Sequence, residues 1–467
     1  MASMVPALLP RLAVAAALLV LGGCATRAPQ VLPLGGLPAP SQWAQPVPAG
    51  TRAAADWWQV FGDGTLVELV EAAQRGNTAI AQAQANLRLA RALRAQAAAA
   101  LAPSLTASAG AQRSRGAAGA SRNNFEAAFD AGWELDLFGA TRHAVAADDA
   151  RVRAGAADLA DAHVSIAAEA ALAYLDLRGA QVRLAVAREN LGIQEETLQI
   201  SRWRQQAGLA SSLEVEQGTS AVEQTRAQLP ALQSAAARSA HALAVLTGQP
   251  PAALLQRLSA AAPVPQPREG VAVAIPAQAL RQRPDVLAAE EQLRAAAEDV
   301  GAADALRKPS VQLGASLAWS GVTLGALGSA GAARSLLAAI VQPVLDGGRL
   351  DAQLAARRAA FDAAQEQYRA RVLAALQEVE DALAALSADR ERLASLQRAL
   401  AAARNASLLA SQRHASGLVD FQTVLDTQRT LLSVQDGVVV LETGLAADHV
   451  RLYKAIGGGW RNPEPLS

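Results

Sequence analysis

The sequence predicts a mainly α-helical fold with four β-strands, arranged as two tandem repeats of long helices. Its apolar residues are mostly alanine, leucine and valine, because 51% of the chain is apolar but only 3% is aromatic. This composition suits long, closely packed helices rather than an aromatic-rich globular core. The 467 residues exceed one ordinary core, so we expect several domains or one elongated architecture. The 42 basic and 42 acidic residues cancel and are spread along the chain, which argues against a nucleic-acid partner.

A duplication organises most of the chain. Glycines in similar local sequence recur 209 positions apart, in the pairs Gly139 and Gly348, Gly208 and Gly417, and Gly248 and Gly457. Short motifs also match: "QQAGLASSLEVEQ" at 205–217 aligns with "HASGLVDFQTVLD" at 414–426, and "RGN" at 75–77 with "RPD" at 283–285. We therefore predict a first repeat over residues 57–274 and a second over residues 275–467. Each runs helix, two strands, very long helix, turn, helix.

Two pairs of strands are expected, at about residues 104–137 and 310–345, where the period of the apolar residues changes from 3.6 to 2. From Phe125 to Leu135 every second residue is apolar, and acidic residues occupy several of the positions between them. In the second repeat the alternation runs from Val311 to Trp319. The glycine-rich stretch "LGALGSAGAA" at 324–333 is interpreted as the hairpin loop of the second pair rather than as a nucleotide cradle.

Strands with one apolar and one polar face over about ten residues are what a transmembrane β-barrel requires. The alternative is two amphipathic hairpins packed on a soluble core. Four strands cannot close a barrel alone, and open sheet edges do not survive in lipid. A membrane barrel therefore requires several copies of the chain to share it.

The helix after the second strand pair is unusually long. From about residue 350 to 416 the sequence has no proline and no glycine. At about 1.5 Å per residue, this segment is on the order of 100 Å long. Val372, Val379, Leu386, Leu393 and Leu400 recur every seven residues, which predicts coiled-coil packing. A plain cytosolic coiled coil would explain this pattern, but neither the strands nor the N-terminal segment.

The first 56 residues are predicted to be a signal and a tether. Residues 1–23 have the layout of a secretory signal, with an apolar stretch too short to span a bilayer as a mature helix. The sequence "LGGC" at 21–24 resembles the bacterial lipobox, so Cys24, the only cysteine, is predicted to become the lipidated first residue. The alternative is an ordinary signal peptide with an incidental cysteine. Residues 24–56 are rich in proline, alanine and glycine, which predicts an extended tether.

In combination, these features resemble the TolC-like family of outer membrane efflux proteins, in particular the NodT-type lipoproteins that serve resistance-nodulation-division (RND) pumps. The resemblance covers nearly the whole chain from Leu21 onward. It rests on the lipobox, on "WW" at 57–58 followed by "FGD" at 61–63, on "LDLFG" at 135–139 matched by "PVLDGGR" at 343–349, and on the paired "AGL" and "SGL" turns. The family's frequent Gly-Pro-Asp-Tyr run after the cysteine is replaced here by "ATRAP" at 25–29.

The resemblance implies an outer membrane channel, the exit duct of a tripartite efflux pump for small molecules such as drugs. A homotrimer would combine three sets of four strands in a 12-stranded barrel and would extend an α-helical barrel through the periplasm. There it would meet a periplasmic adaptor protein and an inner-membrane RND transporter. Because Ala25 rather than an aspartate follows Cys24, the family's sorting rule implies the outer membrane.

The resemblance also assigns residues to a periplasmic tip. Gly208, Leu209, Gly417 and Leu418 would form the two turns that contact the adaptor. Each glycine interrupts a long helical pattern where the chain must reverse, and glycine readily supplies the positive φ of a helix end. The alternative is a simple helix-turn-helix without a partner.

Asp426 and Arg429 match the stretch that closes the periplasmic aperture in the family. Their i, i+3 spacing places a carboxylate and a guanidinium on one helix face. In a trimer the Asp426 side chains would converge near the axis, repel one another and attract cations, while Arg429 would offset the repulsion. The alternative is a solvated helix face. His414 and Gln422 depart from the residues common at these places in the family. This suggests the hypothesis that the gate is held differently, with His414 as a pH-sensitive group, and a solvated helix face is the alternative for His414 too.

No enzymatic activity, metal site or cofactor is predicted, and the only non-protein group expected is the lipid on Cys24. The histidines lie far apart without metal-ligand spacing, at His143, His163, His241, His414 and His449. Two other functions stay open: the exit duct of a type I protein secretion system, and a non-conducting structural periplasmic lipoprotein. The sequence does not name the exported substrate.

Overall fold

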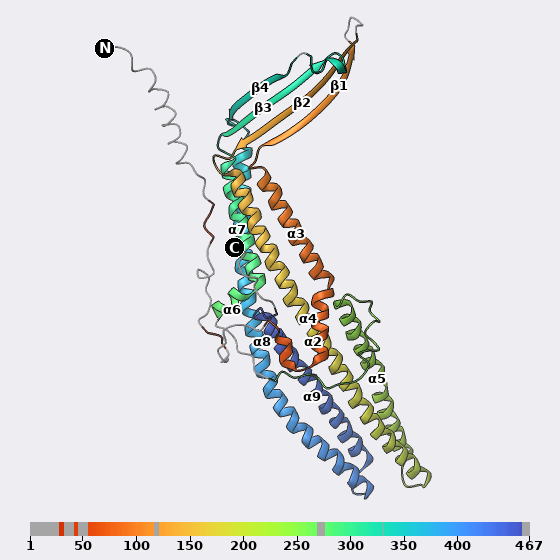
Figure 1. Ribbon diagram of the computed structural model, residues 1–467. Helices are drawn as coiled ribbons and strands as arrows, with labels where there is room; N and C mark the ends of the chain where they lie inside the picture. The colour runs from red at the N-terminus through yellow and green to blue at the C-terminus, as the bar shows by residue number, and fades with distance from the viewer. Residues whose placement is uncertain are drawn as a thin grey trace, which may run out of the picture. The chain divides into compact units, whose positions relative to one another are not determined.

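The computed structural model describes residues 28–31, 42–44, 55–115, 121–268, 276–329 and 331–459, so Cys24 and the predicted signal lie outside the described residues. In chain order (Figure 1) the elements are η2 (Trp57–Phe61), α2 (Gly64–Gly76), α3 (Thr78–Ala99), β1 (Ser104–Arg115), β2 (Ser121–Leu135), α4 (Ala140–Gln206), α5 (Ser212–Leu246), α6 (Pro276–Gln282), α7 (Pro284–Ala305), β3 (Ser310–Gly321), η3 (Leu324–Ala326), β4 (Ala333–Val341), α8 (Arg349–Ala415) and α9 (Phe421–Ala455).

The tandem repeat is confirmed by the order and the lengths of the elements. The series α3, β1, β2, α4, α5 is followed by the equivalent series α7, β3, β4, α8, α9. Helices α4 and α8 each have 67 residues, and α5 and α9 each have 35. Helix α8 occupies the range expected from the stretch without proline and glycine, and at about 1.5 Å per residue it is roughly 100 Å long.

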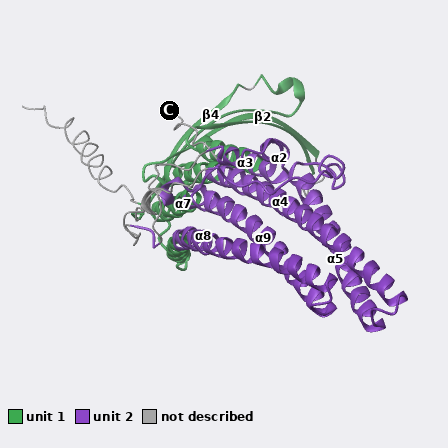
Figure 2. Ribbon diagram, turned by 90° about the horizontal axis from the view of Figure 1, so that it is seen from below, with its two compact units in different colours: residues 1–37, 85–156, 287–370 green, residues 38–84, 157–286, 371–467 purple. Residues whose placement is uncertain are grey.

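The chain divides into two compact units that do not follow the repeats (Figure 2). Unit 1 consists of residues 1–37, 85–156 and 287–370, and unit 2 of residues 38–84, 157–286 and 371–467. Each unit contains matching segments of both repeats. The four strands all belong to unit 1, whereas the two turns that join α4 to α5 and α8 to α9 belong to unit 2.

The strands of unit 1 form one antiparallel sheet in the order β1-β2-β3-β4 (Figure 1). Its register keeps the alternation of each strand in phase with that of its neighbours. Phe129 lies opposite Ala107 on one side and Leu317 on the other, and the adjacent Asp130 lies opposite Thr106 and Ser316. One face therefore carries most of the large apolar residues of the four strands: Leu105, Ala107, Phe125, Ala127, Phe129, Trp133, Val311, Leu313, Leu317, Trp319, Leu336 and Ile340. In β4 the alternation is less strict, since Leu337 and Val341 lie on the opposite face and Arg334 lies on this one.

This apolar face is solvent-exposed in the described chain. Leu105, Leu336 and Ile340 are 71%, 87% and 74% exposed, although burial of such side chains is usually favourable by about 1.5–3 kcal/mol each. The opposite face carries mainly Ser, Thr, Asp, Glu and Gly. The predicted alternation is thus confirmed, with an apolar face that a soluble hairpin would bury. The sheet also has two edges, β1 and β4, that pair with no other strand among the described residues.

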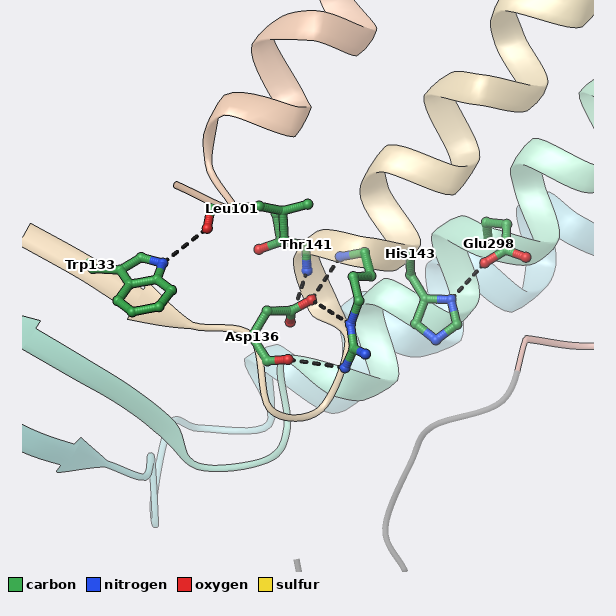
Figure 3. Close-up of polar contacts among 7 residues, drawn as sticks. Leu101, Trp133, Asp136, Thr141, His143 and Glu298 are labelled. Carbon is green, nitrogen blue, oxygen red and sulfur yellow. Dashed lines mark hydrogen bonds and ion pairs between the residues drawn. The ribbon is translucent and has the colours of Figure 1, made fainter. Parts of the chain in front are cut away.

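Acidic side chains fix the passage from each strand pair into the long helix that follows, and Figure 3 shows this passage in the first repeat. The Asp136 carboxylate accepts hydrogen bonds from the backbone N–H groups of Thr141, at 3.2 Å, and Arg142, at 2.8 Å, which lie in the first turn of α4. It thereby satisfies amide groups that have no partner within the helix. On the strand side, Trp133 Nε1 donates to the carbonyl oxygen of Leu101 at 3.0 Å. These bonds hold the end of β2 and the start of α4 in one geometry.

The second repeat uses the same device before α8. Asp346 accepts from the backbone N–H groups of Gly348 and Leu350, at 2.9 and 3.0 Å, and these bonds lower the pKa of its carboxyl. In the first repeat a histidine adds a further contact. His143 Nδ1 lies 2.6 Å from Glu298 Oε2 and joins α4 to α7 within unit 1 (Figure 3).

The motif "WWQVFGD" at 57–63 forms part of the core of unit 2. Trp57 is fully buried and stacks on Tyr453, with ring centroids 5.2 Å apart and an interplanar angle of 11°. Asp63 accepts from the backbone N–H of Leu66 as the N-cap of α2, and its second oxygen accepts from the buried Tyr174 hydroxyl at 2.8 Å. The motif that supported the family resemblance therefore joins η2 and α2 to the long helices α4 and α9.

Two described pieces of the predicted tether pack against the protein. Pro29 and Val31 line a cavity of about 260 Å³ in unit 1 together with α4 and α7 residues that include Arg153. In unit 2, Trp43 is buried in the core, and the backbone N–H of Ala44 donates to a carboxylate oxygen of Glu380 at 3.0 Å. The tether is thus anchored at two points.

Of the helices in the described part of the chain, α9 alone is long and apolar enough, by length and composition, to be considered as a membrane span. It nevertheless carries charged side chains that face other helices of unit 2, such as Asp436, whose carboxylate pairs with Arg183 of α4 at 2.6 Å. We therefore describe α9 as one of the packed helices of unit 2.

Candidate functional site

Two helical hairpins end in equivalent turns in unit 2. Hairpin 1 is α4 and α5 with the turn at Gly208, and hairpin 2 is α8 and α9 with the turn at Gly417. The two glycines have φ angles of 73° and 71°, a left-handed conformation that favours glycine. The residue after each glycine closes the turn, because Leu209 N–H donates to Arg204 O at 2.8 Å and Leu418 N–H donates to Arg413 O at 2.9 Å.

Capping residues then start the returning helices. The Ser211 hydroxyl accepts from Glu214 N–H at 3.3 Å, and the Asp420 carboxylate accepts from Thr423 N–H at 2.9 Å. The hydroxyl and the backbone N–H of Thr423 lower the pKa of Asp420, so this cap stays ionised. The structure thus places the predicted tip residues Gly208, Leu209, Gly417 and Leu418 in two matched turns.

The exposed surface of the two turns differs on their flanks. Leu209 and Leu418 are 71% and 74% exposed and are equivalent. Trp203 and Leu213, which flank the first turn, are 60% and 64% exposed, whereas Gln412 and Gln422 occupy the positions 209 residues later. The first turn therefore presents more apolar surface than the second. Sequence reasoning missed Trp203, although a tryptophan near a turn is conspicuous in a chain with 3% aromatic residues.

The structure brings Asp426 and Arg429 together on α9. Arg429 Nη1 lies 3.7 Å from Asp426 Oδ1, and the two side chains are 49% and 57% exposed. Such an exposed pair contributes about 0–1 kcal/mol, so its effect depends on other charges nearby. Gln422 Nε2 donates to the same Asp426 oxygen at 2.8 Å. Gln422, which departs from the family pattern, thus holds the carboxylate of Asp426, the residue predicted to form the gate.

Arg429 belongs to a polar face of α9 that runs beside hairpin 1. It lines a cavity of about 300 Å³ with residues of α4, α5 and α9 that include Gln194 and Gln224. A second cavity, of about 420 Å³, is lined by residues of the same three helices that include Arg183, Arg238 and Arg451. Asp426 and Arg429 are thus close to polar surface rather than to the apolar core.

Polar contacts join the two hairpins over several helical turns. Besides the Arg183–Asp436 pair, Asn190 Nδ2 donates to Gln435 Oε1 at 2.7 Å, and Gln428 Nε2 donates to Thr197 Oγ1 at 3.2 Å. None of these partners was identified from the sequence, because each pair is separated by more than 200 residues.

An apolar contact lies at the start of α9. Phe421 is 3% exposed and packs with Ala221 and Leu425. It fits above Gly218 of α5, where an added Cβ would lie 3.4 Å from the Phe421 ring and 3.0 Å from Leu198. The tighter of the two distances is to Leu198, so the glycine mainly allows α5 to pack closely on α4, and Phe421 then lies at ordinary contact distance.

His414 lies in the last turn of α8, beside the second turn. It contacts Arg204 of hairpin 1, and its ring centroid is 5.6 Å from that of Phe421. Among the described residues there is no cluster of three His, Cys, Asp or Glu side chains that could hold a metal ion. The five histidines lie on different helices or at different heights along them, and His414 is the one beside a hairpin turn.

Comparison with known proteins decides the family. The outer membrane efflux protein family model matches residues 69–249 and 275–458, one match in each repeat. The chain belongs to this family. It is 33% identical over 467 residues to the pyoverdine export outer membrane protein OpmQ of Pseudomonas aeruginosa, covering 97% of both chains. It is also 30% identical over 458 residues to nodulation protein T of Rhizobium leguminosarum bv. viciae, covering 98% of this chain and 95% of that one.

A solved structure, that of the outer-membrane channel OprN, matches with a TM-score of 0.86 and 34% identity over 93% of this chain and 99% of that one. This outer membrane efflux protein thus has the fold of the TolC-like channels, in which long helices accompany a β-barrel. The comparison confirms the predicted outer membrane location. It also explains the exposed apolar face of the sheet, since lipid covers the outer face of a barrel.

Proposed function

We propose that this efflux protein is the homotrimeric exit duct of a tripartite pump that passes small molecules through the periplasm and the outer membrane. The sheet carries the proposal, because one face is mainly apolar over all four strands and the edge strands β1 and β4 pair with no further strand in the described part of the chain. The strands alternate in direction, so β4 of one copy would run antiparallel to β1 of the next. Three copies would close a 12-stranded barrel without a free edge in lipid.

Cys24 is proposed to anchor each copy through covalent lipid. The position of Ala28–Val31 supports this, since Pro29 and Val31 lie against unit 1, which carries the sheet. The four residue-to-residue steps from Cys24 to Ala28 can span at most about 14 Å when fully extended. Attached acyl chains contribute roughly 0.8 kcal/mol per buried methylene, so several chains would hold the protein firmly.

The turns at Gly208 and Gly417 are proposed to receive a periplasmic adaptor, and Asp426 with Arg429 to form the gate. The exposed Leu209 and Leu418 support the first assignment, because apolar side chains at a rigid turn offer contact area at little entropic cost. The proposed duct is passive and has no enzymatic activity. The energy for transport would come from an inner-membrane RND transporter.

A photo-crosslinking amino acid at Ala210, beside the first turn, tests this function in living cells. The expected result is capture of a periplasmic adaptor together with an RND transporter, identified by mass spectrometry. The same amino acid at Ser329, in the loop between β3 and β4, is the control and should capture neither. Capture of an adaptor with an ATP-driven transporter would replace efflux by protein secretion, and absence of a periplasmic partner would contradict the exit-duct function.

A further inference from the structure

A histidine and an arginine join the ends of the two hairpins. His414 Nε2 lies 2.9 Å from Arg204 Nη1, and His414 Nδ1 lies 3.1 Å from the carbonyl oxygen of Val419. The first contact connects hairpin 2 to hairpin 1, and the second stays within hairpin 2. Both distances are those of ordinary hydrogen bonds.

These two partners select one protonation state of the imidazole. The Val419 carbonyl can only accept a hydrogen bond, so Nδ1 must carry the proton. The Arg204 guanidinium can only donate, so Nε2 must present its lone pair. Only the neutral ring protonated at Nδ1 satisfies both contacts. A proton on Nε2 would place N–H against N–H and a second positive charge about 3 Å from the guanidinium.

The charges around His414 come from three elements. Arg204, in α4, opposes a positive ring, and Arg413 precedes the histidine in α8. Asp420, the N-cap of α9, attracts a positive ring, while its carboxylate already accepts from the backbone and hydroxyl groups of Thr423. Protonation of His414 would therefore remove its attraction to Arg204 of hairpin 1 and strengthen its attraction to Asp420 of hairpin 2.

We propose that His414 is a pH-sensitive latch between the two hairpins, closed by the neutral imidazole and released by the imidazolium. The contacts farther from the turns contain no histidine: Arg183 with Asp436, Asn190 with Gln435, and Thr197 with Gln428. These contacts, and the packing of Phe421 against Ala221 of hairpin 1, do not depend on the charge of His414, so the separation is confined to the turns themselves. The latch lies within one chain, and its consequence for opening of the duct rests on the proposed function.

Spin labels on cysteines introduced at Gln206 and Ser416 measure the separation of the two turns. The full-length Cys24→Ser chain provides a background without natural thiols. Labelled chains are mixed with an excess of unlabelled chains, so that each assembly carries one labelled pair. Between about pH 8 and pH 5, where histidines change charge, the distance distribution should shift to longer values. The ratio of released to latched chains should rise by up to about tenfold per pH unit, the limit for one proton.

Variants separate the latch from general acid effects. In His414→Gln the side-chain oxygen can still accept from Arg204, so the short distance should persist at both pH values. Arg204→Ala removes the donor to His414 and should therefore give the long distance at both pH values. His241→Gln, a change in a histidine of α5, should keep the response of the unaltered chain. An unaltered chain with the same distance at both pH values, or a His414→Gln variant that still responds, would overturn the latch. Measurement of this distance does not depend on transport, so a failure of the efflux function would not be mistaken for a failure of the latch.

Discussion

Arg283 donates a hydrogen bond from Nη1 to the carbonyl oxygen of Ala455 at 2.7 Å, where α9 ends. The first repeat makes the equivalent bond with a neutral side chain, since Asn77 Nδ2 donates to the carbonyl oxygen of Leu246 at 2.9 Å, where α5 ends. The donors come from the matching motifs "RPD" and "RGN". Arg283 aligns with Arg75 rather than with Asn77, so the two repeats keep the accepting carbonyl but take the donor from different positions of the motif.

Replacement of Arg283 by alanine should destabilise the protein more than replacement of Asn77. The Arg283 side chain is 7% exposed and also pairs with Asp285 and Glu378, both at 2.7 Å. Its removal leaves the buried Asp285 carboxylate with only the more distant Arg371, at 3.7 Å, at a cost of up to about 3–5 kcal/mol. Asn77→Ala leaves the Leu246 carbonyl without this donor, at about 1–3 kcal/mol, and also removes the bond that Asn77 Oδ1 accepts from the Ala79 N–H at the start of α3. Denaturant unfolding of the purified protein measures both values, and equal losses would contradict the central role of Arg283.

A positive charge on the apolar face of the sheet should disturb the protein more than the same charge on the polar face. Leu336 and Ser335 are neighbours in β4 and point to opposite faces. An arginine on the lipid face costs about 2–4 kcal/mol near the bilayer midplane. Leu336→Arg should therefore lower the amount of protein assembled in the outer membrane, while Ser335→Arg should leave it nearly unchanged. Heat-sensitive migration of assembled protein on gels measures this amount, and equal effects would exclude Leu336 from the lipid face.

Local patterns in the sequence predicted much of the fold. The alternation from Phe125 to Leu135 and the proline-free stretch before Gly417 each reflect a physical requirement within one element, a two-faced strand or an uninterrupted helix. The repeat then gave a second, independent example of the same pattern, because the long helices and their turns recur 209 residues later. The turns at Gly208 and Gly417 were predictable for the same reason, since a helix must end at a residue that can take positive φ.

The contacts between the hairpins could not be predicted in this way. Arg204 and His414, or Gly218 and Phe421, become neighbours only after the two repeats pack, and no periodicity within one element specifies them. The hydrogen bond from Gln422 to Asp426 is different. Its i, i+4 spacing is visible in the sequence, but a glutamine that replaces an apolar residue gives no indication of which partner it holds.

Replacement of Asp161 by asparagine should stabilise the protein at neutral pH. Burial raises the pKa of Asp161 and the charge of Asp285 adds to this, against the opposing charges of Lys454, Arg283 and Arg371. A raised pKa means that the folded state binds the proton more tightly than the unfolded state, so stability falls as pH rises above the unfolded value. Asp161→Asn should therefore raise the Tm at pH 7, and the gain should vanish near pH 3.

The pH dependence is the decisive part of that measurement. Asp149→Asn is a suitable control, because Asp149 pairs with Arg94 at 2.9 Å on the surface, where an ion pair contributes about 0–1 kcal/mol. This variant should change the Tm little at either pH. If Asp161→Asn gave the same gain at pH 3 as at pH 7, the effect would not come from the ionised carboxylate.

Single-channel recording should show whether Asp426 and Arg429 control the gate. In a trimer the Asp426 carboxylates would surround the axis and favour cations, so Asp426→Ala should reduce cation selectivity and weaken block by divalent ions. Arg429→Ala removes the compensating charge 3.7 Å away, so it should increase cation selectivity and strengthen block by divalent ions. Gln422→Ala removes only the donor that holds the carboxylate and leaves the charge unchanged, so selectivity should persist while the open level fluctuates more. Unchanged selectivity and divalent block in Asp426→Ala would remove this residue from the gate.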